Sequence, residues 1–144
     1  MKAQINLSVV VPWLLSLATA AIGIWQFTQQ QEQKNREPFL QKQLELCFEA
    51  TEAAAVLATE DDPVVWEKAR KTFWRLYWGK LSIVEDRKVE SAMYELGKLV
   101  PKEPLDGPKP PLQSLEQPSL RLAHATRNLI LASWKIDLPP LQGR

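Results

Sequence analysis

The chain has 144 residues, of which 45 % are hydrophobic and 24 % are charged, and it contains six tryptophans. This composition supports a hydrophobic core, so it excludes intrinsic disorder of the whole chain. Eighteen lysines and arginines balance seventeen aspartates and glutamates, which argues against a general nucleic-acid binder because such proteins carry a basic excess. A single cysteine, Cys47, and a single histidine, His124, exclude an internal disulfide framework and argue against a metal cluster built from these residues.

The strongest signal is an apolar run from Leu7 to Phe27 without a charged side chain. A helix needs about 20 predominantly apolar residues to cross the hydrocarbon core of a bilayer, and aromatic side chains favour the headgroup level. Trp25 lies near the C-terminal end of the run. The sequence therefore predicts a transmembrane anchor over 7–27, followed by a polar stalk that ends at residue 36. A cleaved signal peptide, cut near Ala20, and a buried core helix are the alternatives.

The basic residues beside this run indicate its orientation. Lys2 precedes the run, whereas Lys34, Arg36 and Lys42 follow it. Lysine and arginine are enriched on the cytoplasmic side of membrane helices, so the count favours a cytoplasmic C-terminal domain. The unpaired Cys47 agrees, since a lone thiol suits a reducing compartment. The reverse orientation stays open at this point.

Small side chains form one stripe of the predicted anchor. Ser16, Ala20 and Gly23 recur at steps of four and three residues, and such stripes let helices approach closely in lipid. These residues are candidates for transmembrane packing and self-association. The alternative is that small residues are simply common in membrane helices. The run contains no ionisable side chain, so an ion relay within it is unsupported.

The region from 37 to 144 is predicted to be all-α, with a bundle of about four helices. The residue before Pro38 resists helical geometry, so a second helix is expected to begin at this proline and to continue to about Thr59. Its apolar residues recur at steps of three and four. Asp62 followed by a proline predicts the cap of a helix over 64–78, and Asp86 predicts the cap of a helix that ends before residue 101.

The segment 101–118 contains prolines at 101, 104, 108, 110, 111 and 118, which exclude a continuous helix or strand. We interpret it as a proline-rich linker that carries the last helix, Ser119–Lys135, back across the bundle. Leu105, Leu112 and Leu115 are expected to pin it to the domain. The alternative is a proline-rich docking site for a partner.

The stretch from Trp66 to Lys80 combines aromatic and basic side chains. On a helix its apolar arc covers more than half of the circumference, which places the helix centrally or gives it a second face for a partner. The preceding helix and turn are acidic, so the two helices are expected to form an antiparallel pair with complementary charges. Arg70 lies within the aromatic arc and therefore needs stacking or a buried carboxylate partner.

Three interpretations of this helix remain open. In the first, its aromatic side chains are core and its basic side chains pair with the acidic helix. In the second, it binds a protein partner, and the candidates are Arg70, Trp74, Arg75 and Trp78 because tryptophan and arginine dominate interface hot spots. In the third, it contacts anionic lipid or nucleic acid, which the neighbouring acidic residues disfavour.

No catalytic motif, phosphate-binding loop or zinc-ligand spacing is found in the sequence. The sequence therefore predicts no enzyme, no metal site, no cofactor, no small-molecule substrate and no nucleic-acid partner. His124 is interpreted as a packed or surface residue, and Cys47 as a small buried residue on an apolar stripe.

Three segments, EPFLQKQLELCFEATEAAAVLAT, DPVVWEKARKTFWRLYWG and PSLRLAHATRNLILASW, resemble a family of small uncharacterised bacterial proteins with one N-terminal membrane helix and an α-helical soluble domain. The resemblance implies a single-pass protein of the bacterial inner membrane, and it implies no activity.

The sequence as a whole predicts a membrane-anchored interaction module, an adaptor or accessory subunit that holds a protein partner at the inner membrane. The alternative is an oligomeric membrane effector that perturbs the bilayer when its cytosolic domain is triggered.

Overall fold

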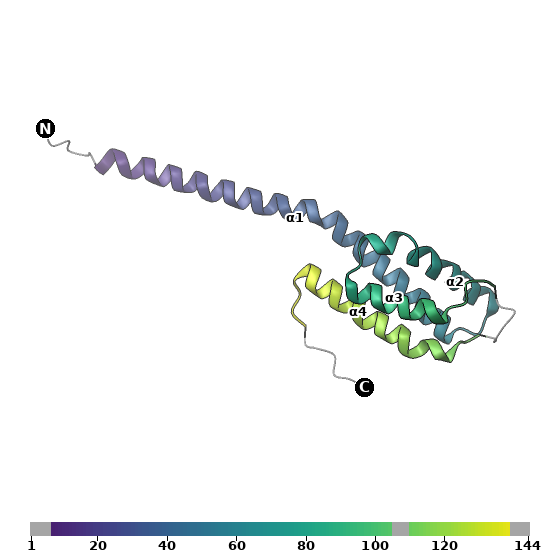
Figure 1. Ribbon diagram of the computed structural model, residues 1–144. Coiled ribbons are helices and arrows are strands. Elements are labelled where there is room, and N and C mark those ends of the chain that lie inside the picture. Colours follow the sequence, from purple (N-terminus) through teal and green to yellow (C-terminus); the bar gives the residue numbers. More distant parts are fainter. Residues whose placement is uncertain (1–6, 105–109, 139–144) are drawn as a thin grey trace. The chain divides into compact units, whose positions relative to one another are not determined.

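The computed structural model describes residues 7–104 and 110–138, except for the side chains of residues 7–12, 14, 29, 32 and 33. The chain divides into two compact units, Met1–Phe39 and Leu40–Arg144. The described residues form four α-helices and two short 3-10 helices: α1 (Leu7–Thr59), α2 (Pro63–Tyr77), η1 (Lys80–Ile83), α3 (Arg87–Leu99), η2 (Gln113–Leu115) and α4 (Glu116–Trp134). Figure 1 shows α2, α3 and α4 gathered along the C-terminal part of α1. The predicted all-α class is confirmed for these residues.

The described residues of the first unit form the N-terminal part of α1, and the large apolar side chains described there are exposed. Leu17 and Ile24 lie on the opposite side of the helix from Leu15 and Ile22, and all four are more than half exposed, at 55 to 66 %. The segment 15–24 of α1 thus carries exposed apolar side chains on opposite sides of the helix.

Among the residues whose side chains are described, no helix is long and apolar enough to cross a membrane. The predicted transmembrane span over 7–27 is therefore not confirmed. The side chains of residues 7–12 and 14, which belong to that span, lie outside the described set.

The predicted helix break at Pro38 is wrong, because α1 continues through this residue from Leu7 to Thr59. A proline inside a helix removes one backbone hydrogen bond and crowds the preceding turn. The residues around it are mostly glutamine, glutamate, lysine and leucine, which have high helix propensity. Beyond the proline, core packing of the second unit holds the helix. These contributions outweigh the local cost.

The core of the second unit joins small side chains of α1 to large ones of α2. Ala50, Ala54 and Leu57 of α1 are fully buried, as are Phe73 and, to within 1 %, Trp66 of α2. Alanines allow the helices to approach closely, and the aromatic rings of α2 are buried with them in one core cluster.

The C-terminal end of α1 obtains hydrogen-bond donors from other parts of the fold. The indole Nε1 of Trp66 donates to the carbonyl of Leu57 at 3.0 Å, and the backbone N–H of Leu112 donates to the same carbonyl at 3.4 Å. The last carbonyls of a helix have no partner within the helix. The start of α2 and the proline-rich segment are therefore tied to the end of α1.

The two predicted helix caps are confirmed. The Asp62 carboxylate accepts from the N–H groups of Val64 and Val65 at the start of α2. The Asp86 carboxylate accepts from the N–H groups of Lys88 and Val89 at the start of α3. Both aspartates have extended backbone geometry, as capping residues require.

The proline-rich segment is shorter than predicted. η2 begins at Gln113, and α4 begins at Glu116 instead of Ser119, because Pro118 fits the first turn of a helix, where its missing N–H is not needed. Leu112 and Leu115 are buried, as expected for residues that pin the segment to the bundle. Leu105 lies outside the described residues.

The cap of α2 leads to a stability prediction with a neighbouring control. We expect Asp62→Ala to lower the free energy of unfolding by about 1 kcal/mol, because it removes the acceptor of two backbone N–H groups. Asp61→Ala removes a side chain of the same kind that accepts neither bond, and we expect a change below about 0.5 kcal/mol. Urea unfolding followed by circular dichroism measures both. Equal effects would contradict the cap assignment.

Candidate functional site

The side chains of α2 divide between the core and the surface along the helix. Trp66, Phe73 and Leu76 are buried, Trp74 and Tyr77 are partly buried, and Trp78, which ends the helix, is 73 % exposed. The core interpretation is therefore correct for the first part of the aromatic arc. Only the C-terminal end of α2 presents a large aromatic surface to solvent.

The exposed indole of Trp78 rests on other aromatic rings. It stacks on Trp74 with a centroid distance of 6.3 Å, and it meets the edge of Tyr77 at 4.7 Å. Tyr77 itself lies against α3 at Gly97, where an added Cβ would come within 2.9 Å of its ring. The absence of a side chain at Gly97 thus permits this position of Tyr77. Trp78 is held on one side and open to solvent on the other.

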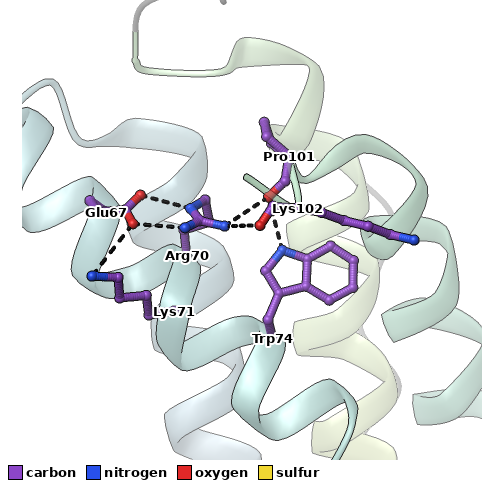
Figure 2. A network of polar contacts seen from close by, with 6 residues as sticks. All are labelled: Glu67, Arg70, Lys71, Trp74, Pro101 and Lys102. Carbon is purple, nitrogen blue, oxygen red and sulfur yellow. Dashed lines mark hydrogen bonds and ion pairs between the residues drawn. The ribbon is translucent and has the colours of Figure 1, made fainter. Parts of the chain in front are cut away.

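Arg70 is almost completely buried, with 5 % of its surface exposed, and its guanidinium connects two elements. Nε and Nη2 donate to the two carboxylate oxygens of Glu67, both at 2.7 Å. Nη1 donates to the backbone carbonyls of Pro101 and Lys102. Figure 2 shows this network. The carboxylate partner expected from the sequence is Glu67, one turn earlier on the same helix.

Trp74 takes part in the same network, since its Nε1 donates to the carbonyl of Pro101 at 2.9 Å (Figure 2). Two donors of α2 thus hold the point where α3 passes into the proline-rich segment. Arg70 and Trp74, two of the four candidates for partner binding, make hydrogen bonds within the bundle. Their geometry indicates a structural role.

The remaining charged candidate, Arg75, lies on the surface and pairs with Glu49 of α1 at 2.6 Å. This ion pair joins α1 to α2, as the complementary charges predicted. The Arg75 side chain is exposed and the Glu49 side chain is partly buried, so solvent screens the pair and it contributes little stability.

A groove of about 410 Å³ lies beside Trp78. Its walls come from the end of α2, from η1 and its following turn, and from the first turns of α3. The lining residues are Tyr77, Trp78, Ser82, Glu85, Arg87, Glu90, Ser91, Met93 and Tyr94. Ile83, which is 77 % exposed, and Tyr94, which is 54 % exposed, extend the apolar surface in this part of the fold. We call the groove bounded by the lining residues the Trp78 groove; Ile83 lies outside this lining.

Carboxylates give the Trp78 groove a local negative charge. Burial raises the pKa of Glu85 above its ordinary value, and the nearby charges of Glu90 and Asp86 raise it further. No hydrogen bond or ion pair joins the Glu85 or Glu90 side chain to another described residue. Asp86 is engaged as the cap of α3.

The described residues contain no cluster of metal-ligand side chains, and the thiol among them is buried. Among them, no three His, Cys, Asp or Glu side chains are grouped to hold a metal ion. Cys47 is 1 % exposed, and burial, followed by the charges of Asp86 and Glu85, raises its pKa to about 11. The thiol therefore stays protonated, and the thiolate is the reactive form. His124 is exposed on α4.

The candidates for transmembrane packing lie on the first unit. Ser16 and Ala20 are exposed, and a Cβ added at Gly23 would meet no heavy atom within 4 Å. Their surface is therefore open to a neighbouring helix.

Sequence reasoning missed the α3 side of the groove. Tyr94, Glu85 and Glu90 belong to a helix and turn that carry no unusual pattern. Their proximity to Trp78 depends on how α3 packs against α2. The local signal available was Trp78 followed by Gly79, which marks the end of the helix.

Comparisons with protein-family models, with curated proteins and with solved structures find no match for this chain.

The Arg70 network predicts a specific pH dependence. The hydrogen bonds and charge of Arg70 lower the pKa of Glu67 below its ordinary value of 4.5. The ionised Glu67 therefore stabilises the fold above that value, and the contribution is lost as the pH falls through the lowered pKa. We expect Glu67→Gln to lower the unfolding free energy by about 1 kcal/mol at pH 7, with a difference from wild type that shrinks below pH 4.5.

Urea midpoints measured between pH 7 and pH 3 test this prediction. Glu52→Gln is the matched control, because Glu52 is an exposed carboxylate of α1 outside the network. A Glu67→Gln difference that stays constant with pH would contradict the role of this ion pair.

Proposed function

We propose that this protein is a membrane-attached interaction module at the bacterial inner membrane, with its second unit in the cytoplasm, and that it binds a protein partner through the Trp78 groove. The observation that carries the proposal is the 73 % exposure of Trp78 beside a groove of about 410 Å³. Tryptophan and tyrosine are enriched among the residues that contribute most of the binding energy at protein interfaces.

The packing of Trp78 favours this interpretation. Its indole stacks on Trp74 and contacts Tyr77, while Trp74 is held by the carbonyl of Pro101. Binding costs free energy when flexible side chains must be ordered. A ring that is already supported loses less conformational freedom. Trp78 is therefore the leading candidate among the four α2 residues, and Arg70 and Trp74 act by supporting the surface.

The attachment to a membrane rests on the first unit. Apolar side chains surround the N-terminal part of α1 and are exposed on opposite sides of it. A helix that is apolar around its circumference belongs in a protein core or in lipid, and the uncharged run over 7–27 has the length that a bilayer requires. The same exposed stripe of Ser16, Ala20 and Gly23 would serve the alternative function, an oligomeric membrane effector.

A photo-cross-linker at Ser82 tests the partner-binding proposal in intact cells. Ser82 lines the groove and is exposed, so a partner bound there lies within reach. We expect one foreign protein to be cross-linked near stoichiometry, and we expect Trp78→Ala to reduce the yield at least about tenfold, as for a hot-spot tryptophan.

Two controls accompany this experiment. A cross-linker at Leu120, an exposed residue of α4, should not capture the same protein. Trp134→Ala removes another exposed tryptophan, at the end of α4, and should leave the yield unchanged. Cross-linking to copies of the chain alone, or a yield independent of Trp78, would contradict the proposal and favour the oligomeric effector.

The membrane attachment is tested by replacing Leu17 and Ile24 with arginine. Each arginine near the centre of a membrane helix costs about 2.5 to 3.5 kcal/mol on insertion scales. We expect the wild-type chain to stay in the membrane pellet after alkaline extraction and the double variant to move to the supernatant. Gln30→Arg with Gln31→Arg, placed in the polar stalk, should behave like wild type. Extraction of the wild-type chain would overturn the attachment.

A further inference from the structure

We propose that the Trp78 groove recognises a partner segment that presents a lysine or arginine side chain next to an apolar side chain. This inference rests on the proposed function, because it names the chemistry of the partner that the same surface binds. Three observations support it. The walls of the groove are aromatic, two carboxylates that line it form no ion pair with a described residue, and the lining contains one cation, Arg87.

The walls of the groove suit an apolar group and a cation together. Tyr77, Trp78 and Tyr94 contribute ring surfaces, and Met93 is buried beneath them with 2 % exposure. Cations are attracted to the faces of aromatic rings. The chain already contains one such contact, since the Nζ of Lys98 lies 4.3 Å from the centroid of the Tyr94 ring. The open side of Trp78 offers a second ring for a cation from the partner.

The carboxylates supply the charge that a cation would neutralise. Glu85 and Glu90 both line the groove, and neither is paired with another described residue. Burial of Glu85 and repulsion from Glu90 raise the pKa of Glu85. The ionised Glu85 carboxylate therefore has no paired positive charge to offset its burial. A cation between the two would relieve this repulsion, whereas an anionic partner would increase it.

Arg87 is the one cation among the lining residues, so the two carboxylates leave a net negative charge. Arg87 is exposed, and it forms no ion pair within 4.0 Å with Glu85 or Glu90. A basic partner must compete with this guanidinium. Removal of Arg87 should therefore strengthen the binding of a basic segment, while it would weaken the binding of an acidic one.

A random-peptide selection against the full-length chain in detergent micelles tests the proposal without assuming a sequence. We expect the selected dodecapeptides to contain lysine or arginine beside leucine or an aromatic residue. Selection against Glu85→Gln with Glu90→Gln should lose the basic preference and keep the apolar one. Selection against Trp78→Ala, with Trp134→Ala as the matched control, should enrich no peptide of this kind.

The affinity of the best selected peptide gives the quantitative test. We expect replacement of its arginine or lysine by citrulline to raise the Kd by about tenfold. The same peptide should bind the double glutamine variant about tenfold more weakly and the Arg87→Ala variant a few-fold more tightly. Binding to Trp134→Ala should match wild type.

Several outcomes would overturn the inference. These are the selection of acidic peptides, equal affinity of the basic and citrulline peptides, weaker binding by Arg87→Ala, or no selected peptide. A Trp78-dependent self-association seen in sedimentation would assign the groove to a second copy and would also overturn it. If the Ser82 cross-linker still captures a foreign partner in a Trp78-dependent way, the proposed function stands and only the charge preference fails.

Discussion

The burial of α2 against the C-terminal part of α1 is the constraint on which the rest of the second unit depends. Trp66 and Phe73 are buried in one core with the alanines of α1, and the indole of Trp66 donates to a carbonyl near the end of α1. Because these contacts fix the rotation of α2 about its axis, they also decide which aromatic side chains remain outside. Trp78 follows the last residue of α2, and its indole lies on Trp74 and Tyr77 with one side open to solvent.

The position of Arg70 shows how the same helix combines core and polar requirements. A guanidinium within an aromatic arc must find acceptors, since an unpaired buried charge is costly. Glu67 and the carbonyls of Pro101 and Lys102 provide them. This arrangement fixes the beginning of the proline-rich segment and supports Trp74, on which Trp78 rests. The exposed aromatic surface at Trp78 is therefore a consequence of the internal network.

The helix caps could be predicted from the sequence, whereas the continuity of α1 and the start of α4 could not. The caps at Asp62 and Asp86 were predictable because a side chain bonds backbone groups two and three residues away. The continuity of α1 through Pro38 was not, because a local penalty was outweighed by helix propensity and core packing. The early start of α4 is not evident from the sequence because Pro118 closes a proline-rich run, although it suits the first turn of a helix.

The sequence by itself determined the all-α class, the helix caps and the uncharged run over 7–27. It also determined that one helix is aromatic and has an arginine, Arg70, within its apolar arc. These properties follow from periodicity, capping chemistry and composition, which act over a few residues. Only the tertiary structure decided that Arg70 and Trp74 turn inward and that Trp78 turns outward. It also brought Glu85, Glu90 and Tyr94 to the same groove. The physical reason is that these relations depend on which faces of α2 and α3 become buried, and burial is a property of the packed helices together.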